Sequence, residues 1–245
     1  MAEEHPRSVR VDGMQSLQPT PQRRQSRRLA AAMREVITNL VSTTAEPEEL
    51  AQAAEQLEAI AALLGSLPSG QSYEGFSEAA NAGAALRALT ETWDDDDPER
   101  FDFFDHSPLI GLSNPLSPPM VVDYDPADPS RLTARANFGP AYEGPPGCVH
   151  GGYVAAVFDE LLGATQSLSG IAGMTAHLGV DYRSPTPLGE DLVLTGWLDR
   201  TEGRKIWAKA ELHAGDRLCA ESEALFIAMD PEGFQELLAL RNAPG

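Results

Sequence analysis

Residues 148–163 place a carboxylate and two glycines where they can do chemistry. Gly151 and Gly152 form a tight turn into an apolar helix, and a helix start offers unbonded N–H groups and partial positive charge. Asp159 lies on that helix among apolar neighbours, which predicts partial desolvation and a raised pKa. Glu160 is rotated from it by about 100°, so it is expected to be exposed and is the weaker candidate. The segment predicts an anion-stabilising site beside a candidate base or nucleophile.

The residue types leave structural alternatives open. Asp159 can equally be a buried acid that hydrogen-bonds to backbone, and His150 can cap the helix rather than bind a ligand. Two small residues, Ala155 and Gly163, flank Asp159 on its helix face, so either a ligand or another helix can approach there. Gly151 and Gly152 permit close backbone approach, which suits an N–H aimed at a developing oxyanion.

Other catalytic chemistries lack their motifs. The sequence has no Gly-x-Ser-x-Gly elbow, no Gly-x-Gly-x-x-Gly, no phosphate-loop lysine and no histidine pair with zinc-site spacing. Cys148 and Cys219 are the only cysteines; they could form one bridge, but no CxxC pattern occurs. The run Asp94–Asp97 is expected to be solvated, because oxygen-ligand loops space their ligands. Neither a metal nor a cofactor is therefore predicted.

Charge and hydropathy narrow the protein class. The 245-residue chain has a formal charge of -19, which argues against a general nucleic-acid binder. Residues 1–35 carry seven arginines and four acids, so their net is +3 and the rest of the chain carries -22. No stretch is apolar and long enough to span a bilayer, and the first residues lack the order of a signal peptide. A cytoplasmic protein is expected.

The N-terminal region is expected to be an extension of a larger domain. Residues 1–25 read as a flexible tail, residues 26–68 as an α-helical hairpin, and residues 69–117 as an irregular connection. Arg23, Arg24, Arg27 and Arg28 are expected to be solvated, with a tether to acidic partners as the alternative. The narrow apolar stripes of the hairpin must pack on the main domain, on a partner subunit or on each other.

Residues 118–245 are expected to form the main domain, of α+β class. Two strands (120–124 and 132–138) precede a helix at 151–167, and four strands follow in a meander. A further helix is expected at 232–240. An antiparallel sheet covering a single helix accounts for this order of elements. The four later strands are expected at 173–183, 190–199, 204–213 and 217–228.

These residues resemble a known family. His150-Gly151-Gly152 followed by Asp159 looks like the signature of hotdog-fold acyl-CoA thioesterases of the phenylacetate-pathway (PaaI-like) type. The stretches 173–185 and 187–190 fit the strand that follows in that family, and the match covers about residues 118–229. The resemblance implies a sheet wrapped around one long central helix, with active sites between the subunits of a homodimer or a dimer of dimers.

The resemblance also implies roles for single residues. Asp159 matches the catalytic carboxylate, acting as general base or nucleophile, and Gly151 matches the N–H donor to the thioester oxygen. His150 matches the motif histidine, and Thr175 matches a residue that positions water or the carboxylate. The implied activity is hydrolysis of acyl-CoA to free acid and CoA. The implied residues for substrate or CoA binding are Gly152, Tyr153, Arg183, Ser184 and Arg204, with Arg200 and Lys205 as further cations for the nucleotide.

One position departs from the family pattern. Some relatives have Asn or Gln six residues before the motif histidine, where this chain has Gly144. Glu143 or Gln166 is a candidate to replace that polar side chain. The departure keeps a second hypothesis open, in which the same fold is a non-catalytic module that binds or senses acyl-CoA. Tyr153, Phe158 and Leu162 are expected to set the depth of the acyl pocket.

Overall fold

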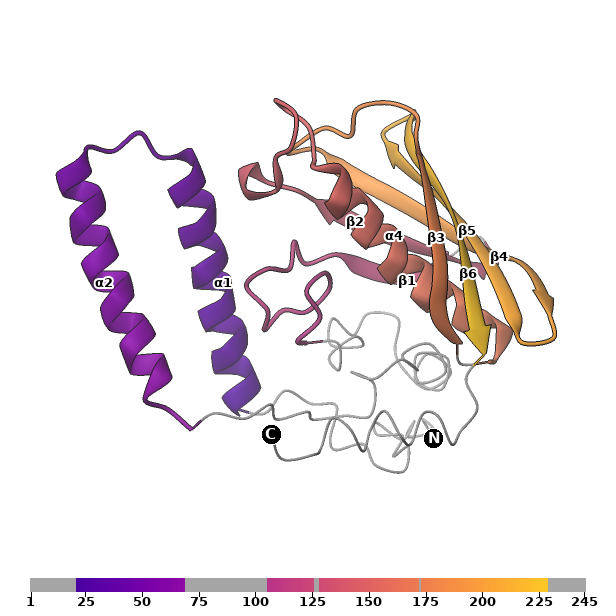
Figure 1. The fold of residues 1–245 in the computed structure, drawn as a ribbon, viewed down its shortest axis with the longest axis horizontal. Coiled ribbons are helices and arrows are strands. Elements are labelled where there is room, and N and C mark those ends of the chain that lie inside the picture. The colour runs from indigo at the N-terminus through magenta and orange to yellow at the C-terminus, as the bar shows by residue number, and fades with distance from the viewer. Residues whose placement is uncertain (1–20, 69–104, 126–127, 172, 229–245) are drawn as a thin grey trace, which may run out of the picture.

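The computed structural model describes residues 21–68, 105–125, 128–171 and 173–228. Two helices, α1 (Pro21–Ser42) and α2 (Pro47–Gly65), form the N-terminal extension. Figure 1 shows α1 between α2 and the rest of the protein. The expected helix at 232–240 and the Asp94–Asp97 run lie outside the described residues.

Local signals explain the start of α2. Glu46 and Glu49 form a reciprocal capping box, and Pro47 occupies the first turn, where its missing N–H costs nothing. Glu48 and Glu49 also complement the positive end of the helix dipole. By contrast, α1 has no acidic residue in its first turn. It therefore depends on tertiary contacts.

The predicted tail boundary at residue 25 is wrong, because α1 already begins at Pro21. Arg23 and Arg27 are not solvated as expected. Arg23 is only 6% exposed, and both guanidinium groups form ion pairs with the buried carboxylate of Asp105, at 3.9 and 2.8 Å. The acidic partner of these arginines therefore lies in the same chain.

One long helix, α4 (Gly151–Gln166), lies across a six-stranded antiparallel sheet (Figure 1). This arrangement confirms the predicted α+β class and hotdog architecture. One face of α4 and the facing sides of the strands form the core. The strands are β1 (Val121–Asp125), β2 (Asp128–Asn137), β3 (Gly173–Tyr182), β4 (Asp191–Glu202), β5 (Lys205–Ala214) and β6 (Arg217–Ala228).

The strand order corrects the expected meander. The order is β1-β2-β4-β5-β6-β3, so β4, β5 and β6 form a meander but β3 does not join it. Instead β2 pairs with β4, and β3 crosses over to pair with β6 at the edge of the sheet. Periodicity identified each strand but not its neighbour, because pairing depends on connections that run over α4.

Residues 105–120, hereafter the strap, pack between α1 and the sheet domain. Most of the strap falls in the stretch 69–117 that was expected to be an irregular connection, and the structure has several turns there. The strap is closed by backbone hydrogen bonds from Met120 to Leu109 and from Ser113 to Asp105, and Tyr142 Oη donates to the Leu116 carbonyl. Within the described ranges, no helix is long and apolar enough to cross a membrane.

Candidate active site

The carboxylate of Asp159 is held by a side chain from the edge strand. Thr175 Oγ1 donates a hydrogen bond of 3.0 Å to Asp159 Oδ1. The pairing of β3 with β6 shifts register between Thr175 and His177, so a bulge lies directly after Thr175. Bulges commonly redirect a side chain next to functional sites. The two residues, 16 positions apart in sequence, are brought together as the resemblance implies.

The start of α4 is ordered by two side chains. His150 is the N-cap, and its Nδ1 accepts a 3.0 Å hydrogen bond from the Gly152 N–H. Tyr182, at the end of β3, donates a 2.7 Å hydrogen bond from its Oη to the Gly151 carbonyl. The Gly151 N–H makes no hydrogen bond to an acceptor among the described residues. That donor is therefore available to an external oxygen, while His150 acts as a cap.

Sequence reasoning did not assign a role to Tyr182. Its signal was present, because Tyr182 lies inside the strand stretch 173–185 that carries the resemblance. Only the structure shows that the end of β3 meets the first turn of α4. Tyr182 thereby ties the helix start to the same strand whose Thr175 holds Asp159.

Gly144 has a structural explanation. A Cβ at this position would lie 2.7 Å from the Cα of His150, so a side chain requires the backbone to move. Its N–H donates to the Cys148 carbonyl at 2.9 Å, which closes the loop before α4. Glu143 is engaged in the same loop, where Oε1 accepts from the Gly147 N–H at 2.6 Å. Gln166 is buried at the opposite end of α4. Neither Glu143 nor Gln166 therefore occupies the position of the polar side chain that is missing at Gly144.

The expected environments of the two neighbouring carboxylates are reversed. Asp159 is exposed in the single chain, whereas Glu160 is half-buried and accepts a 3.2 Å hydrogen bond from Ser107 of the strap. Burial raises the pKa of Glu160 to about 7; the Ser107 bond lowers that pKa and the negative charge of Asp159 raises it further. The helix turns its Asp159 face away from the sheet, which hydrophobicity alone did not indicate.

Glu160 makes stability depend on pH in a defined direction. Its pKa is about 7 in the folded state against 4.5 in the unfolded state, so the folded state binds the proton more tightly. This contribution is full below pH 4.5 and is lost as the pH rises through 7. Urea unfolding at pH 5 and pH 8 should show that Glu160→Gln loses less stability than the wild type, by up to about 3 kcal/mol.

A matched variant separates this effect from general titration. Glu190→Gln removes an exposed carboxylate between β3 and β4, and it should keep the pH dependence of the wild type. If the unfolding free energy changes with pH equally in the wild type and in Glu160→Gln, the raised pKa of Glu160 is not the source of the pH dependence.

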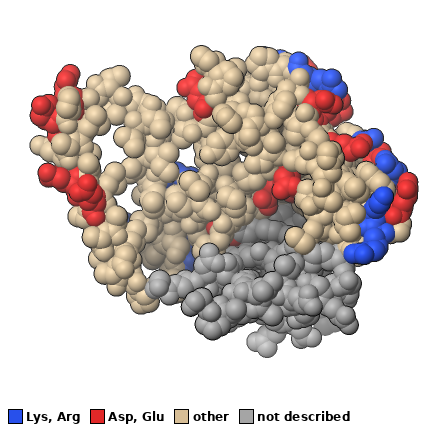
Figure 2. All heavy atoms as spheres, in the orientation of Figure 1, with Lys and Arg blue, Asp and Glu red and all other residues tan. Residues whose placement is uncertain are grey.

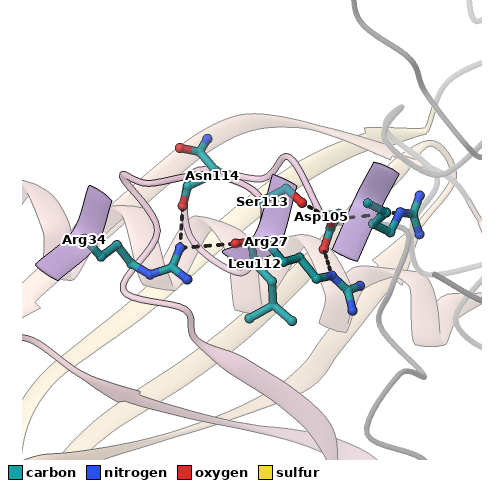
Figure 3. A network of polar contacts seen from close by, with 7 residues as sticks. Arg27, Arg34, Asp105, Leu112, Ser113 and Asn114 are labelled. Atoms are coloured by element: carbon teal, nitrogen blue, oxygen red, sulfur yellow. Dashed lines mark hydrogen bonds and ion pairs between the residues drawn. The ribbon is translucent and has the colours of Figure 1, made fainter. Parts of the chain in front are cut away.

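The strap connects this site to the N-terminal extension. Figure 3 shows Asp105 accepting hydrogen bonds from Arg27 and Ser113, and Arg34 donating to the carbonyls of Leu112 and Asn114. At its other side, the strap contacts α4 through the bond from Ser107 to Glu160. A continuous set of polar contacts therefore runs from α1 to the residue after Asp159.

The predicted CoA-binding cations do not converge in one chain. Arg183 forms ion pairs with Glu221 and Asp181. It lies in a groove of about 640 Å³ on the sheet face opposite α4, and Trp197 and Lys209 also line this groove. Arg204 donates to the Ala228 carbonyl at the other end of β6.

Ser184 donates to the Leu218 carbonyl at 2.7 Å, which is a structural contact within the chain. The two remaining cations lie on the β4–β5 hairpin, where both approach the ring of Trp207. Arg200 lies 4.1 Å and Lys205 6.0 Å from its centroid.

The expected pocket residues also differ in placement. Tyr153 packs edge-on against Tyr142 at 4.8 Å and near Phe138, so its ring belongs to an aromatic cluster. Phe158 and Leu162 are fully buried between α4 and the sheet. The role of these three side chains in setting the depth of the acyl pocket stays a prediction. Gly152 is exposed beside the free N–H of Gly151.

Cys148 and Cys219 are both free thiols. Among the described residues, no group of three or more His, Cys, Asp or Glu side chains is placed to hold a metal ion.

Comparisons with known proteins agree with this geometry. A model of the "Thioesterase superfamily" matches residues 146–221, which run from before α4 into β6. Acyl-coenzyme A thioesterase THEM4 of Bos taurus is 37% identical over 107 residues, covering 43% of this chain and 44% of that protein. The Xenopus laevis protein of the same name is 39% identical over 103 residues, covering 41% and 46%. The chain thus matches less than half the length of these curated relatives.

A solved structure extends the likeness to most of the chain. The crystal structure of a thioesterase superfamily protein is 30% identical, with a TM-score of 0.64. The match covers 82% of this chain and 94% of that one. The strap and the sheet domain (105–228) make up about half of the sequence, so a match of this extent also includes residues outside them. The chain belongs to the thioesterase superfamily.

Proposed function

We propose that this protein hydrolyses acyl-CoA thioesters to a free acid and CoA. The observation that carries the proposal is the Asp159 carboxylate, exposed to a ligand yet fixed by Thr175 at 3.0 Å. The available Gly151 N–H at the positive end of α4 supplies the second requirement, a donor for an oxyanion. The curated relatives that match this part of the chain are named acyl-coenzyme A thioesterases.

Spacing along α4 indicates that each site needs two copies of the chain. Gly151 and Asp159 are eight residues apart, so they are separated by about 12 Å along the helix axis. An oxyanion donor and a base on the attacking water must both lie within about 3 Å of the reacting groups. A site that pairs Asp159 of one copy with Gly151 of a second copy satisfies both limits.

The edge strand offers the surface for that pairing. β3 is at the end of the sheet order and residues 174–177 are exposed. An open edge presents N–H and C=O groups that a second strand can pair with. Pairing of β3 with β3 of a second copy continues the sheet and brings two α4 helices together on the same side. A homodimer with interfacial sites is therefore part of the proposal, and a dimer of dimers remains compatible with it.

The reaction can then be written with these residues. Asp159 takes a proton from water as the water oxygen bonds to the thioester carbon, and the Gly151 N–H stabilises the resulting oxyanion. The carbon–sulfur bond breaks as the carbonyl re-forms, and the Asp159 proton passes to the CoA sulfur. Direct attack by Asp159, followed by hydrolysis of the anhydride, is the alternative with the same residues.

The proposal predicts thiol release from acyl-CoA. Purified full-length chain should release CoA, followed with a thiol reagent, across a panel from acetyl-CoA to palmitoyl-CoA, with a maximum at one range of lengths. Oxygen esters of the same acyl groups serve as controls and should be poorer substrates. Saturable acyl-CoA binding without release at any length would instead support the binding or sensing module.

A further inference from the structure

Two hydroxyl groups of β3 bind the residues of α4 that carry the proposed chemistry. Thr175 Oγ1 donates to Asp159 Oδ1 at 3.0 Å. Seven residues further along the same strand, Tyr182 Oη donates to the Gly151 carbonyl at 2.7 Å. The hydroxyl of Tyr182 thus lies at the helix start that supplies the proposed oxyanion donor, and the family resemblance implies no role for it.

Two successive glycines make this helix start intrinsically loose. Gly151 and Gly152 have no Cβ, so their φ and ψ angles are less restricted than those of other residues. Helix ends are also where fraying begins. The direction of the Gly151 N–H depends on how the first two peptide groups of α4 are oriented. Because an oxyanion donor owes its effect to preorganisation, a donor that turns freely stabilises the oxyanion poorly.

Side chains hold the peptide group between these two glycines at both of its polar atoms. Its carbonyl oxygen, on Gly151, accepts the hydrogen bond from Tyr182. Its N–H, on Gly152, donates to His150 Nδ1 at 3.0 Å. The preceding peptide group is held through the His150 carbonyl, which accepts from the Tyr153 N–H at 2.9 Å. With both peptide groups fixed, the free N–H of Gly151 points in one direction.

The phenol ring of Tyr182 also lies against Gly151. A Cβ added at Gly151 would be 3.2 Å from Tyr182 Oη and 3.4 Å from Cε1 and Cζ of the ring. A side chain at position 151 would therefore push the phenol away from the carbonyl that it binds. This close packing accounts for a glycine at the first position of α4 without reference to any ligand.

The end of β3 is anchored by contacts other than this hydroxyl. The N–H groups of Arg183 and Ser184 both donate to the Cys219 carbonyl, at 2.8 and 3.0 Å. Figure 2 shows basic and acidic groups side by side on the sheet domain, and Arg183 takes part in such pairs. Tyr182 itself is 55% exposed, so its hydroxyl does not fill the core. A change from tyrosine to phenylalanine therefore removes the contact with the helix start and little else.

We infer that Tyr182 is a positioning residue that aligns the Gly151 N–H with the thioester oxygen. The inference rests on the proposed hydrolysis of acyl-CoA and on sites that are shared between two copies of the chain. Tyr182 and Gly151 belong to the same copy, so Tyr182 serves the site whose Asp159 comes from the other copy. One edge strand thereby acts on two sites, since its Thr175 holds the base of one and its Tyr182 orients the donor of the other.

A nuclear magnetic resonance experiment tests the contact without depending on turnover. Gly151-Gly152 is the only pair of adjacent glycines in the sequence. Full-length protein labelled with glycine that carries ¹³C at the carbonyl and ¹⁵N at the amide therefore gives one amide signal coupled to a labelled carbonyl carbon. That signal comes from the peptide group that accepts from Tyr182. Tyr182→Phe should change the carbon shift of this signal, because the carbonyl loses a donor.

Tyr142→Phe is the matched control for this measurement. It also removes a tyrosine hydroxyl that donates to a backbone carbonyl, that of Leu116 at 3.1 Å. The Gly151-Gly152 signal should keep its wild-type carbon shift in this variant. An unchanged carbon shift in Tyr182→Phe would show that the contact is absent in solution and would overturn the inference.

Steady-state kinetics test the effect of the contact on the reaction. Tyr182→Phe should lower kcat for acyl-CoA hydrolysis about tenfold, because water can partly replace an exposed hydroxyl and the donor itself is retained. KM should stay at its wild-type value, since the bond from the donor strengthens only as the oxyanion forms. Tyr142→Phe should keep both constants. Absence of turnover in the wild type would refute the proposed hydrolysis, whereas wild-type kcat in Tyr182→Phe would refute the positioning role alone.

Mixed dimers test which site Tyr182 serves. Tyr182→Phe is mixed with Asp159→Asn or with Gly151→Pro, and mass spectrometry confirms that the subunits have exchanged. With Asp159→Asn, each mixed dimer keeps one site in which every group is wild type, so turnover should rise to about a quarter of the wild-type value. With Gly151→Pro no site is restored, and turnover should be about half that of Tyr182→Phe alone. The reversed pattern, or equal turnover in the two mixtures, would overturn the assignment of Tyr182 to the Gly151 side of the site.

Discussion

Asp159→Asn is expected to lower kcat for acyl-CoA hydrolysis by about 10²–10⁴, the range for loss of a general base. The amide oxygen can still accept the hydrogen bond from Thr175, so the geometry of the side chain is retained while its basicity is lost. The measurement is thiol release at saturating acyl-CoA. Asp216→Asn, at an exposed carboxylate in the β5–β6 turn, should retain wild-type turnover. Full turnover by Asp159→Asn would refute the proposed role.

A second variant tests whether the site is shared between copies. Gly151→Pro removes the N–H proposed as oxyanion donor, at the first helical position, where the proline ring is compatible with a helix. The new Cβ would lie 3.2 Å from Tyr182 Oη, so the end of that side chain must shift by a few tenths of an ångström. His150 already has the extended conformation (φ -60°, ψ 132°) that proline requires of its predecessor. Asp159→Asn and Gly151→Pro should each be nearly inactive when assayed alone. For Gly151→Pro, loss of the oxyanion donor is expected to lower the turnover rate by about 10²–10³.

Mixing the two inactive variants should recover activity. In a mixed dimer, one site keeps both wild-type groups, so random re-pairing should restore about a quarter of wild-type turnover. If mass spectrometry shows that subunits have exchanged and yet no activity is recovered, Asp159 of one copy and Gly151 of the other do not form a shared site.

Asp105→Ala is expected to destabilise the protein by about 3–5 kcal/mol, the cost of removing one partner from a buried ion pair. Asp105 is 3% exposed, and its loss removes the ion pair that it forms with the buried guanidinium of Arg23. Urea unfolding should show the loss directly. Trypsin should also cut α1 faster, because the helix is released from the strap.

The control for this variant uses an ion pair of similar type at the surface. Asp128 pairs with Arg131 at 3.2 Å, but its side chain is 46% exposed. Asp128→Ala should cost less than about 1 kcal/mol, as for exposed ion pairs. Similar losses for the two variants would mean that the Asp105 cluster is no stronger than a surface pair.

The elements that carry the candidate site were predictable from the sequence because their signals are local. A Gly-Gly turn followed by apolar periodicity specifies α4, and alternation specifies each strand to within a few residues. The pairing of Asp159 with Thr175 came from the order of two motifs, and the structure brings the two side chains into contact. The expected fold followed from those same motifs.

Features that depend on rotation or on distant partners were not predictable in this way. Whether Asp159 or Glu160 faces the body depends on how α4 turns against the sheet and the strap, and both residues have the same local neighbours. The anchoring of Arg27 by Asp105 joins positions 78 residues apart. The edge position of β3 likewise depends on a crossover that no single window of sequence contains.

The long separation between Arg27 and Asp105 has a consequence for synthesis of the chain. A ribosome adds about 5–20 residues per second, so α1 emerges roughly 4–16 seconds before the carboxylate that anchors it. During this interval the Arg-rich helix is present without its buried counter-ion, and its docking contact closes a long loop. Docking of α1 is therefore expected to be a late step in folding, and truncated nascent chains that end before residue 105 should leave it sensitive to protease.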